Sequence, residues 1–305
     1  MLCWRLLLGT SIIAALVGLC VLDATMAIPG VVLLPVAVVV ALLATREVLD
    51  LAAAANLRPL RWAVYCGNLL IVGSNVSLVV FYYNFHWLSR VRYADWRPWQ
   101  SWFSIVGPLW SLAIAAMIVF LAEIRRYREP GGTFANIAAA LFAFVYVGVM
   151  LSLAVDLRLA WGLGGLASWV IVVKFGDTGA YTVGRLIGRH KMAPLISPGK
   201  TMEGTLGGLA FSCLGAWLTF RWLVPQCVLE TVEPGPWWGW MVFGVLVGAA
   251  GMVGDLAESL LKRDVGLKDS STWLPGFGGV LDIIDSLLLS APVAWACWYF
   301  GLVGR

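Results

Sequence analysis

The sequence is poor in the residues that form most metal and redox sites. Its 305 residues include two histidines, His86 and His190, and six cysteines without a Cys-x-x-Cys pair. We therefore expect no zinc or haem site and no disulfide framework. The cysteines are expected to pack as small apolar groups.

Charge is scarce as well. Charged residues make up 12% of the chain and apolar residues 61%, with a mean hydropathy of +0.87; ordinary soluble domains carry about twice that charged share. Only helices and closed barrels span lipid, and the apolar runs are longer than barrel strands. The composition predicts an all-α, polytopic transmembrane helix bundle. A net charge of +4 without a basic tract predicts no nucleic-acid partner.

Apolar runs of membrane length predict about nine spans. They lie near residues 6–22, 27–45, 60–83, 102–122, 133–155, 159–175, 204–224, 236–253 and 279–300. We divide the chain into N-terminal transmembrane helices, residues 1–155, and a C-terminal transmembrane catalytic region, residues 156–305.

The first run has two interpretations. It follows Arg5 and ends near the small residues Ala24 to Ala27, a pattern that also fits a cleaved signal peptide. Its apolar core is long for a signal peptide, so a retained span is favoured.

Arginines and lysines gather in alternate loops, which indicates the orientation. They occur in 46–61, 123–131, 176–203 and 254–278, so this face is expected to be cytoplasmic with the N-terminus inside. The loop 86–100, which carries three arginines on the opposite side, departs from this rule. The expected location is the cell (inner) membrane, with the polar site of the C-terminal half facing the cytoplasm.

Ionisable residues are densest between Gly254 and Ser286, with apolar spans on both sides. Charged residues at membrane depth are costly and usually mark a site or an ion path. If the segment after Gly254 is helical, Asp255, Glu258 and Lys262 share one face. The alternative is an ordinary charged loop with local ion pairs.

A second acidic face is expected to meet the first. Asp282 and Asp285 lie three residues apart, and Pro275-Gly276 and Gly278-Gly279 form a sharp turn before them. Carboxylates that converge repel one another unless a cation lies between them. Mg²⁺ suits carboxylate and phosphate oxygens.

A further polar stretch runs from Lys174 to Thr205. Gly199-Lys200-Thr201 resembles the end of a phosphate loop but lacks its first glycine and its preceding strand. Such a turn at a helix start can still hold phosphate. The alternative is plain helix capping, with Thr201 as the cap and Glu203 in the first turn.

These motifs together resemble those of the phosphatidate cytidylyltransferases, also called CDP-diacylglycerol synthases. The resemblance covers residues 177–286 closely, and the N-terminal half only by its layout of spans. It rests on Asp177-Thr-Gly-Ala-Tyr181, Gly184-Arg185, Ser197-Pro198, Lys200-Thr201-x-Glu203-Gly204, Gly254-Asp255-Leu256-x-Glu258-Ser259-x-x-Lys262-Arg263, Lys268-Asp269, Pro275-Gly276-x-Gly278-Gly279 and Asp282-x-x-Asp285-Ser286.

The resemblance implies that a phosphate oxygen of phosphatidate attacks the α-phosphorus of CTP, giving CDP-diacylglycerol and pyrophosphate for phospholipid biosynthesis. Asp255, Asp282 and Asp285 would hold Mg²⁺, as one ion or a pair, and Lys262 would act with them in catalysis. The residues implied in substrate binding are Lys200, Arg263, Lys268, Asp177, Arg185, Ser197 and Glu203. The implied partners are CTP, phosphatidate and the bilayer; glycines in the spans also allow a homodimer.

Two residues depart from the family pattern. Phe277 stands where the family usually has a histidine, and Ile283 where it usually has an arginine. Three alternatives therefore stay open: transfer to a different lipid phosphate, a non-catalytic paralogue, and an ion-coupled transporter.

Overall fold

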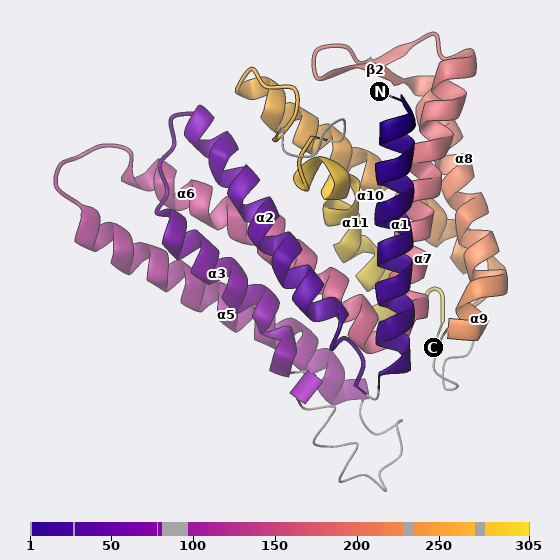
Figure 1. Cartoon of the computed structure of the whole chain (residues 1–305), viewed down its shortest axis with the longest axis horizontal. Coiled ribbons are helices and arrows are strands. Elements are labelled where there is room, and N and C mark those ends of the chain that lie inside the picture. The colour runs from indigo at the N-terminus through magenta and orange to yellow at the C-terminus, as the bar shows by residue number, and fades with distance from the viewer. Residues whose placement is uncertain are drawn as a thin grey trace, which may run out of the picture. The chain divides into compact units, whose positions relative to one another are not determined.

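The computed structural model describes residues 2–26, 28–77, 79–80, 97–227, 235–271 and 278–304. Its elements, shown in Figure 1, are α1 (Leu2–Thr25), α2 (Leu33–Ala54), α3 (Arg61–Gly73), α5 (Arg97–Arg126), α6 (Thr133–Ala143), the π-helical turn η2 (Phe144–Val149), α7 (Met150–Ile187), β1 (Lys191–Ala193), β2 (Ser197–Thr201), α8 (Met202–Leu218), the π-helical turn η3 (Thr219–Leu223), α9 (Val224–Cys227), α10 (Trp237–Asp264) and α11 (Leu281–Tyr299).

The expected helical membrane protein is confirmed. Among the described residues, five helical stretches are long and apolar enough to cross a membrane: Ile105–Arg126, Thr133–Ile187, Met202–Cys227, Trp237–Asp264 and Leu281–Tyr299. The other predicted runs, 6–22, 27–45 and 60–83, fall largely on α1, α2 and α3.

A break interrupts the longest stretch a few residues beyond the boundary that the apolar runs indicate. Inside α7, Trp161 has φ −123° and Gly162 has φ +66°, angles that no α-helix contains. Glycine suits this position because it has no Cβ to oppose a positive φ. The break therefore lies just inside the predicted run 159–175 rather than between it and the run 133–155.

The chain forms two compact units. The first comprises Met1–Leu159 with Asp269–Ile283, and the second Ala160–Lys268 with Ile284–Arg305. Helix α11 therefore begins in the first unit and continues in the second.

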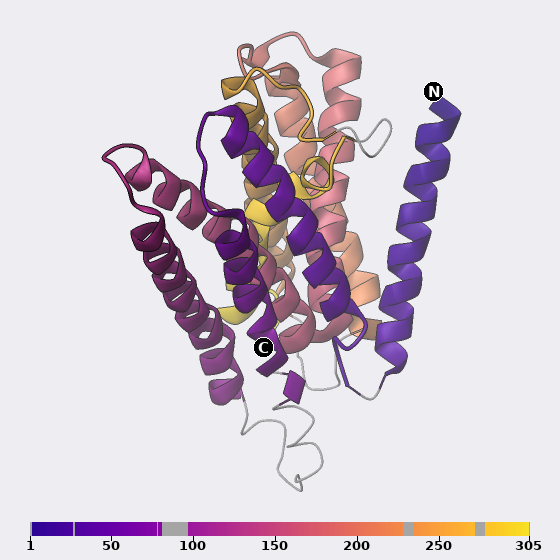
Figure 2. The ribbon, with the colours of Figure 1, turned by 60° about the vertical axis from the view of Figure 1, so that its left-hand side comes forward.

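In the first unit, α3 packs against both α2 and α5. Figure 2 shows α3 lying along α5, with the end of α5 beside the start of α3. Small and branched apolar residues, such as Ala63, Val64 and Ile71, are fully buried on α3. Apolar burial and close contact hold these helices together.

A buried ion pair also belongs to the first unit. Arg158 Nη2 and Nε lie 2.7 Å and 2.8 Å from Asp23 Oδ2. Oδ1 of Asp23 accepts from the backbone N–H of Val32 at 2.9 Å, and Oδ2 from that of Gly30 at 3.1 Å. The carboxylate of Asp23, near the end of α1, thus neutralises Arg158 and accepts hydrogen bonds from backbone amides just before α2.

In the second unit, α8 packs along α10. The contact is close because glycines face it: a Cβ on Gly244 would lie 2.7 Å from Cys213 Cα. β1 and β2 form a small antiparallel hairpin before α8, an element that the sequence analysis did not anticipate.

Candidate functional site

The start of α8 lies beside the hairpin. Lys200 is in β2, and Thr201 caps α8 by accepting a hydrogen bond from Gly204 N–H at 3.1 Å. Glu203 lies in the first turn of α8. The predicted capping is therefore confirmed, and Lys200 extends from a strand that ends at a helix N-terminus.

Lys200 contacts the second acidic stretch. Its Nζ lies 2.9 Å from Oδ2 of Asp255 on α10, and the two side chains are 22% and 39% exposed. Oδ1 of Asp255 accepts from Ser259 Oγ, one turn further on, at 3.5 Å. The two polar stretches that the sequence singles out, separated along the chain, thus meet at this ion pair.

Close contact between α10 and α11 brings a second carboxylate toward Asp255. A Cβ on Gly254 would lie 2.5 Å from the backbone oxygen of Asp285 and 3.1 Å from Ser286 Cα, so only glycine allows this approach. Asp285 lies within electrostatic range of Asp255, Asp177 and Lys174. Asp285, one of the two residues of the predicted second acidic face, therefore lies near Asp255, while the convergence of both complete faces stays a prediction.

Asp177, on α7, joins the same group. Its Oδ2 lies 3.0 Å from Lys174 Nζ and accepts from Ser286 Oγ at 3.3 Å. Lys174 Nζ also donates to Ser286 Oγ at 3.2 Å. The site therefore combines α7, β2, α10 and α11.

The donor set suits a hard cation. Three carboxylates, Asp177, Asp255 and Asp285, face two ammonium groups, Lys174 and Lys200, which leaves an excess of negative charge. Carboxylate oxygens are the ligands that Mg²⁺ prefers. Within the described ranges, no three His, Cys, Asp or Glu side chains are already placed to share one ion.

Asp282, the other predicted metal ligand, belongs to the first unit. Its Oδ2 accepts from Ser270 N–H at 2.9 Å, Ser270 Oγ at 2.7 Å and Gly279 N–H at 2.7 Å. Gly278 has φ +85°, which confirms that a glycine is needed in this turn. Asp282 thus fixes the turn that precedes α11.

The structure adds a residue that sequence reasoning missed. Glu47 on α2 is 3% exposed, and its carboxylate accepts from Val280 N–H at 2.9 Å, Leu281 N–H at 2.7 Å and Ser270 Oγ at 2.9 Å. It therefore caps α11 and shares Ser270 with Asp282. The available signal was an acidic residue just after the apolar run 27–45.

Lys262 forms an ion pair in the last turn of α10. Its Nζ lies 2.6 Å from Oε2 of Glu258, whose side chain is fully buried, and Lys262 itself is 9% exposed. The shared face of Glu258 and Lys262 is as predicted. The catalytic role expected for Lys262 stays a prediction.

Two predicted substrate-binding residues hold the hairpin region. Glu203 accepts from the backbone N–H of Arg189 at 3.1 Å and lies 2.6 Å from His190 Nδ1. Arg263 donates from Nε to the backbone oxygen of Ile196 at 3.4 Å. Both contacts fix the position of the strands next to Lys200.

The other predicted binding residues are Arg185, Ser197 and Lys268. Arg185 Nη1 donates to Tyr181 Oη at 2.7 Å on the exposed end of α7. Ser197 is half-buried at the start of β2, and Lys268 is exposed after α10. Pro275, Gly276 and Phe277 lie outside the described residues, whereas Ile283 lies in the first turn of α11.

Matches to known proteins show the family of the chain. The model of the cytidylyltransferase family matches residues 9–300, so the chain belongs to that family. It is similar to curated proteins named phosphatidate cytidylyltransferase. The relative from Staphylococcus saprophyticus is 34% identical over 194 residues, which cover 63% of this chain and 70% of the relative.

Two further relatives carry the same name. The protein of Mycobacterium bovis is 34% identical over 212 residues, covering 65% of this chain and 66% of that protein. The protein of Staphylococcus haemolyticus is 35% identical over 182 residues, covering 59% and 66%. In both cases the matched part spans just under two thirds of the relative.

Proposed function

We propose that this chain transfers the cytidylyl group of CTP to the phosphate of phosphatidate, giving CDP-diacylglycerol and pyrophosphate. Membership of the cytidylyltransferase family and the curated relatives support this reaction. The observation that carries it is the contact of Lys200 with Asp255, close to Asp285, because it joins a phosphate-binding cation to clustered carboxylates.

Residues of the chain itself would position the substrates. Lys200 would hold a phosphate group of a substrate, and the hairpin bonded to Arg263 and Glu203 would keep that lysine in place. Little covalent chemistry is required of side chains in transfer at phosphorus, so orientation and charge neutralisation supply most of the rate enhancement.

Asp255 and Asp285, with Asp177 beside them, fit Mg²⁺ by donor type and charge. When bound, Mg²⁺ would neutralise the phosphate oxygens of CTP and of the lipid. Asp282 stays a proposed third ligand on the evidence of the sequence, while its observed bonds hold the turn before α11.

Topology and assembly are further parts of the proposal. Nine spans in the cell (inner) membrane would place the hairpin and the ends of α7 and α10 on the cytoplasmic face, where CTP is available. Labelling of single cysteines from each side tests this orientation. A homodimer is proposed from the glycines in the spans alone, and crosslinking in vesicles tests it.

The deciding experiment is turnover of purified protein with radiolabelled CTP and phosphatidate, with and without Mg²⁺. We expect Mg²⁺-dependent formation of a CDP-lipid. Binding of CTP without product would indicate a different lipid phosphate as acceptor. Absence of both binding and product would refute the proposal and favour a non-catalytic paralogue, which the departures at Phe277 and Ile283 would explain.

A further inference from the structure

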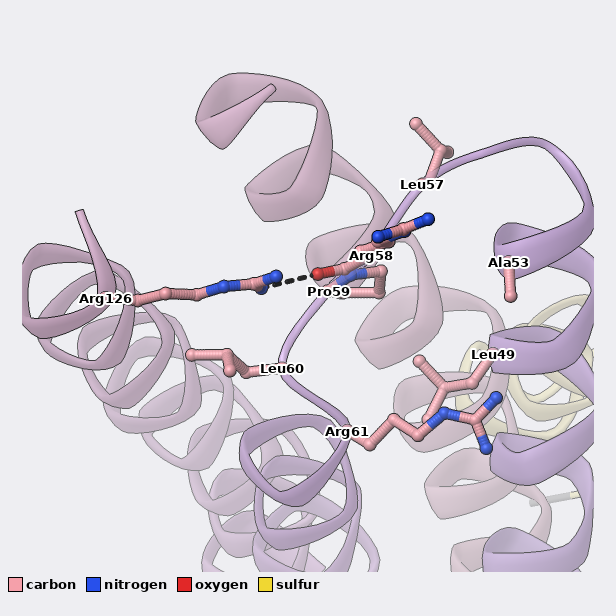
Figure 3. Close-up of a pocket in the computed structure, with 8 residues that line it drawn as sticks. All are labelled: Leu49, Ala53, Leu57, Arg58, Pro59, Leu60, Arg61 and Arg126. Atoms are coloured by element: carbon pink, nitrogen blue, oxygen red, sulfur yellow. Dashed lines mark hydrogen bonds between the residues drawn. The ribbon is translucent and has the colours of Figure 1, made fainter. Parts of the chain in front are cut away.

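A separate pocket lies in the first unit, outside the site described above. Its volume is about 310 Å³, and it is shown in Figure 3. It lies where α2 ends, α3 begins and α5 ends. The lining residues are Leu49, Ala53, Leu57, Arg58, Pro59, Leu60, Arg61 and Arg126.

Three of the lining side chains are guanidinium groups. Arg126 donates from Nη1 to the backbone oxygen of Arg58 at 2.7 Å, which fixes the connecting segment against α5. Arg61 pairs with Asp50, and Nη2 of the arginine lies 2.6 Å from Oδ1 of the aspartate. Arg58 is exposed, and the described part of the chain offers its guanidinium no ion-pair partner. Its charge is therefore available to a ligand.

The acidic neighbours do not cancel this charge. Asp50 is paired with Arg61 and lies 3.9 Å from Arg46, so two arginines share one carboxylate. Glu123 lies 3.5 Å from Arg126 Nη1. The pocket and its immediate contacts thus carry four arginines and two carboxylates, a balance that favours an anion.

The pocket also lies at the end of apolar helices. The candidate span Ile105–Arg126 ends at one of its lining residues. Trp62 and Tyr127 next to it are 57% and 52% exposed, as is typical of aromatic side chains at the membrane–water boundary. Between the arginines, the lining consists of leucine, alanine and proline.

We propose that this pocket binds the phosphate headgroup of an anionic membrane phospholipid. Arginine forms bidentate hydrogen bonds with phosphate oxygens, and basic pockets between transmembrane helices favour phosphorylated lipid headgroups. The apolar lining would contact the glycerol and the first acyl carbons. The residues that line this lipid site all belong to the first unit and include neither Lys200 nor Asp255, so the proposal goes beyond the transfer reaction.

Native mass spectrometry of the detergent-purified full chain with added phosphatidylglycerol or phosphatidylcholine tests the proposal. We expect phosphatidylglycerol to bind preferentially and Arg58→Ala to weaken that binding by about tenfold, the loss of one charge-assisted contact. Arg58→Lys should restore only part of the affinity, because lysine keeps the charge but not the bidentate geometry.

The matched control is Arg125→Ala, which removes an equal charge from the last turn of α5 outside the pocket lining. It should leave lipid binding within about twofold of the wild type, since exposed charges are weakly coupled. Equal loss in both variants, or no loss in Arg58→Ala, would overturn the proposal. Displacement of the lipid by millimolar inorganic phosphate alone would also overturn it, by showing that the pocket recognises free phosphate.

Discussion

Replacing Glu47 by glutamine should loosen the start of α11. Oε2 accepts from both Leu281 N–H and Ser270 Oγ, and Oε1 accepts from Val280 N–H. The amide of glutamine keeps one oxygen, so in either orientation at least one buried donor faces an NH₂ group. A hydrogen bond to a charged group contributes about 1.5–3 kcal/mol. We therefore expect the local opening free energy to fall by about 2 kcal/mol.

Hydrogen exchange followed by mass spectrometry measures this loss directly. A decrease of about 2 kcal/mol corresponds to roughly 30-fold faster exchange of the Val280 and Leu281 amides. Asp50→Asn, one turn further along α2, is the control because Asp50 is 45% exposed and pairs with Arg61. Unchanged exchange in Glu47→Gln, or equal acceleration in both variants, would refute the capping role of Glu47.

Four other substitutions test the core and the site. Asp23→Asn should destabilise the protein by about 3–5 kcal/mol, because it leaves the charge of Arg158 buried without its partner, and a thermal shift in detergent measures this. Asp282→Asn and Asp285→Asn should each abolish Mg²⁺-dependent turnover while the protein stays folded and extractable. Lys200→Ala should raise the KM for CTP or phosphatidate by about tenfold or more, as measured in steady-state kinetics.

For each of these substitutions, one result would contradict the prediction. Wild-type turnover in either aspartate variant would remove that residue from the proposed metal site. Unchanged substrate affinity in Lys200→Ala would make the lysine structural, a partner of Asp255 only. An unchanged melting temperature for Asp23→Asn would show that the pair with Arg158 adds nothing to stability.

The helices were predictable because their cause is local. Long apolar runs must satisfy their backbone groups internally, so the sequence alone indicated helices for α5, α8, α10 and α11. The hairpin of β1 and β2 was not predicted, since its eleven residues contain proline and glycine and show no strand alternation. Glu203 and Arg263, from α8 and α10, contact residues that flank its strands.

The site was predictable to the extent that it depends on spacing within a helix. Helical periodicity indicated that Asp255, Glu258 and Lys262 share a face, and within α10 the structure shows the one-turn contacts of Glu258 with Lys262 and of Asp255 with Ser259. Glu47 and Arg158 were missed because their partners are remote: Glu47 bonds to Leu281, 234 residues further along the chain. No local pattern reports such a contact.

The ion pair between Asp23 and Arg158 bears on how the chain is processed. A protease that cut at the small residues Ala24 to Ala27 would release Asp23 with the first helix. Arg158 would then lose the carboxylate that pairs with it, and the amides of Gly30 and Val32 would lose their acceptor. The mature protein should therefore retain α1, and the intact mass of the purified chain would reveal its loss.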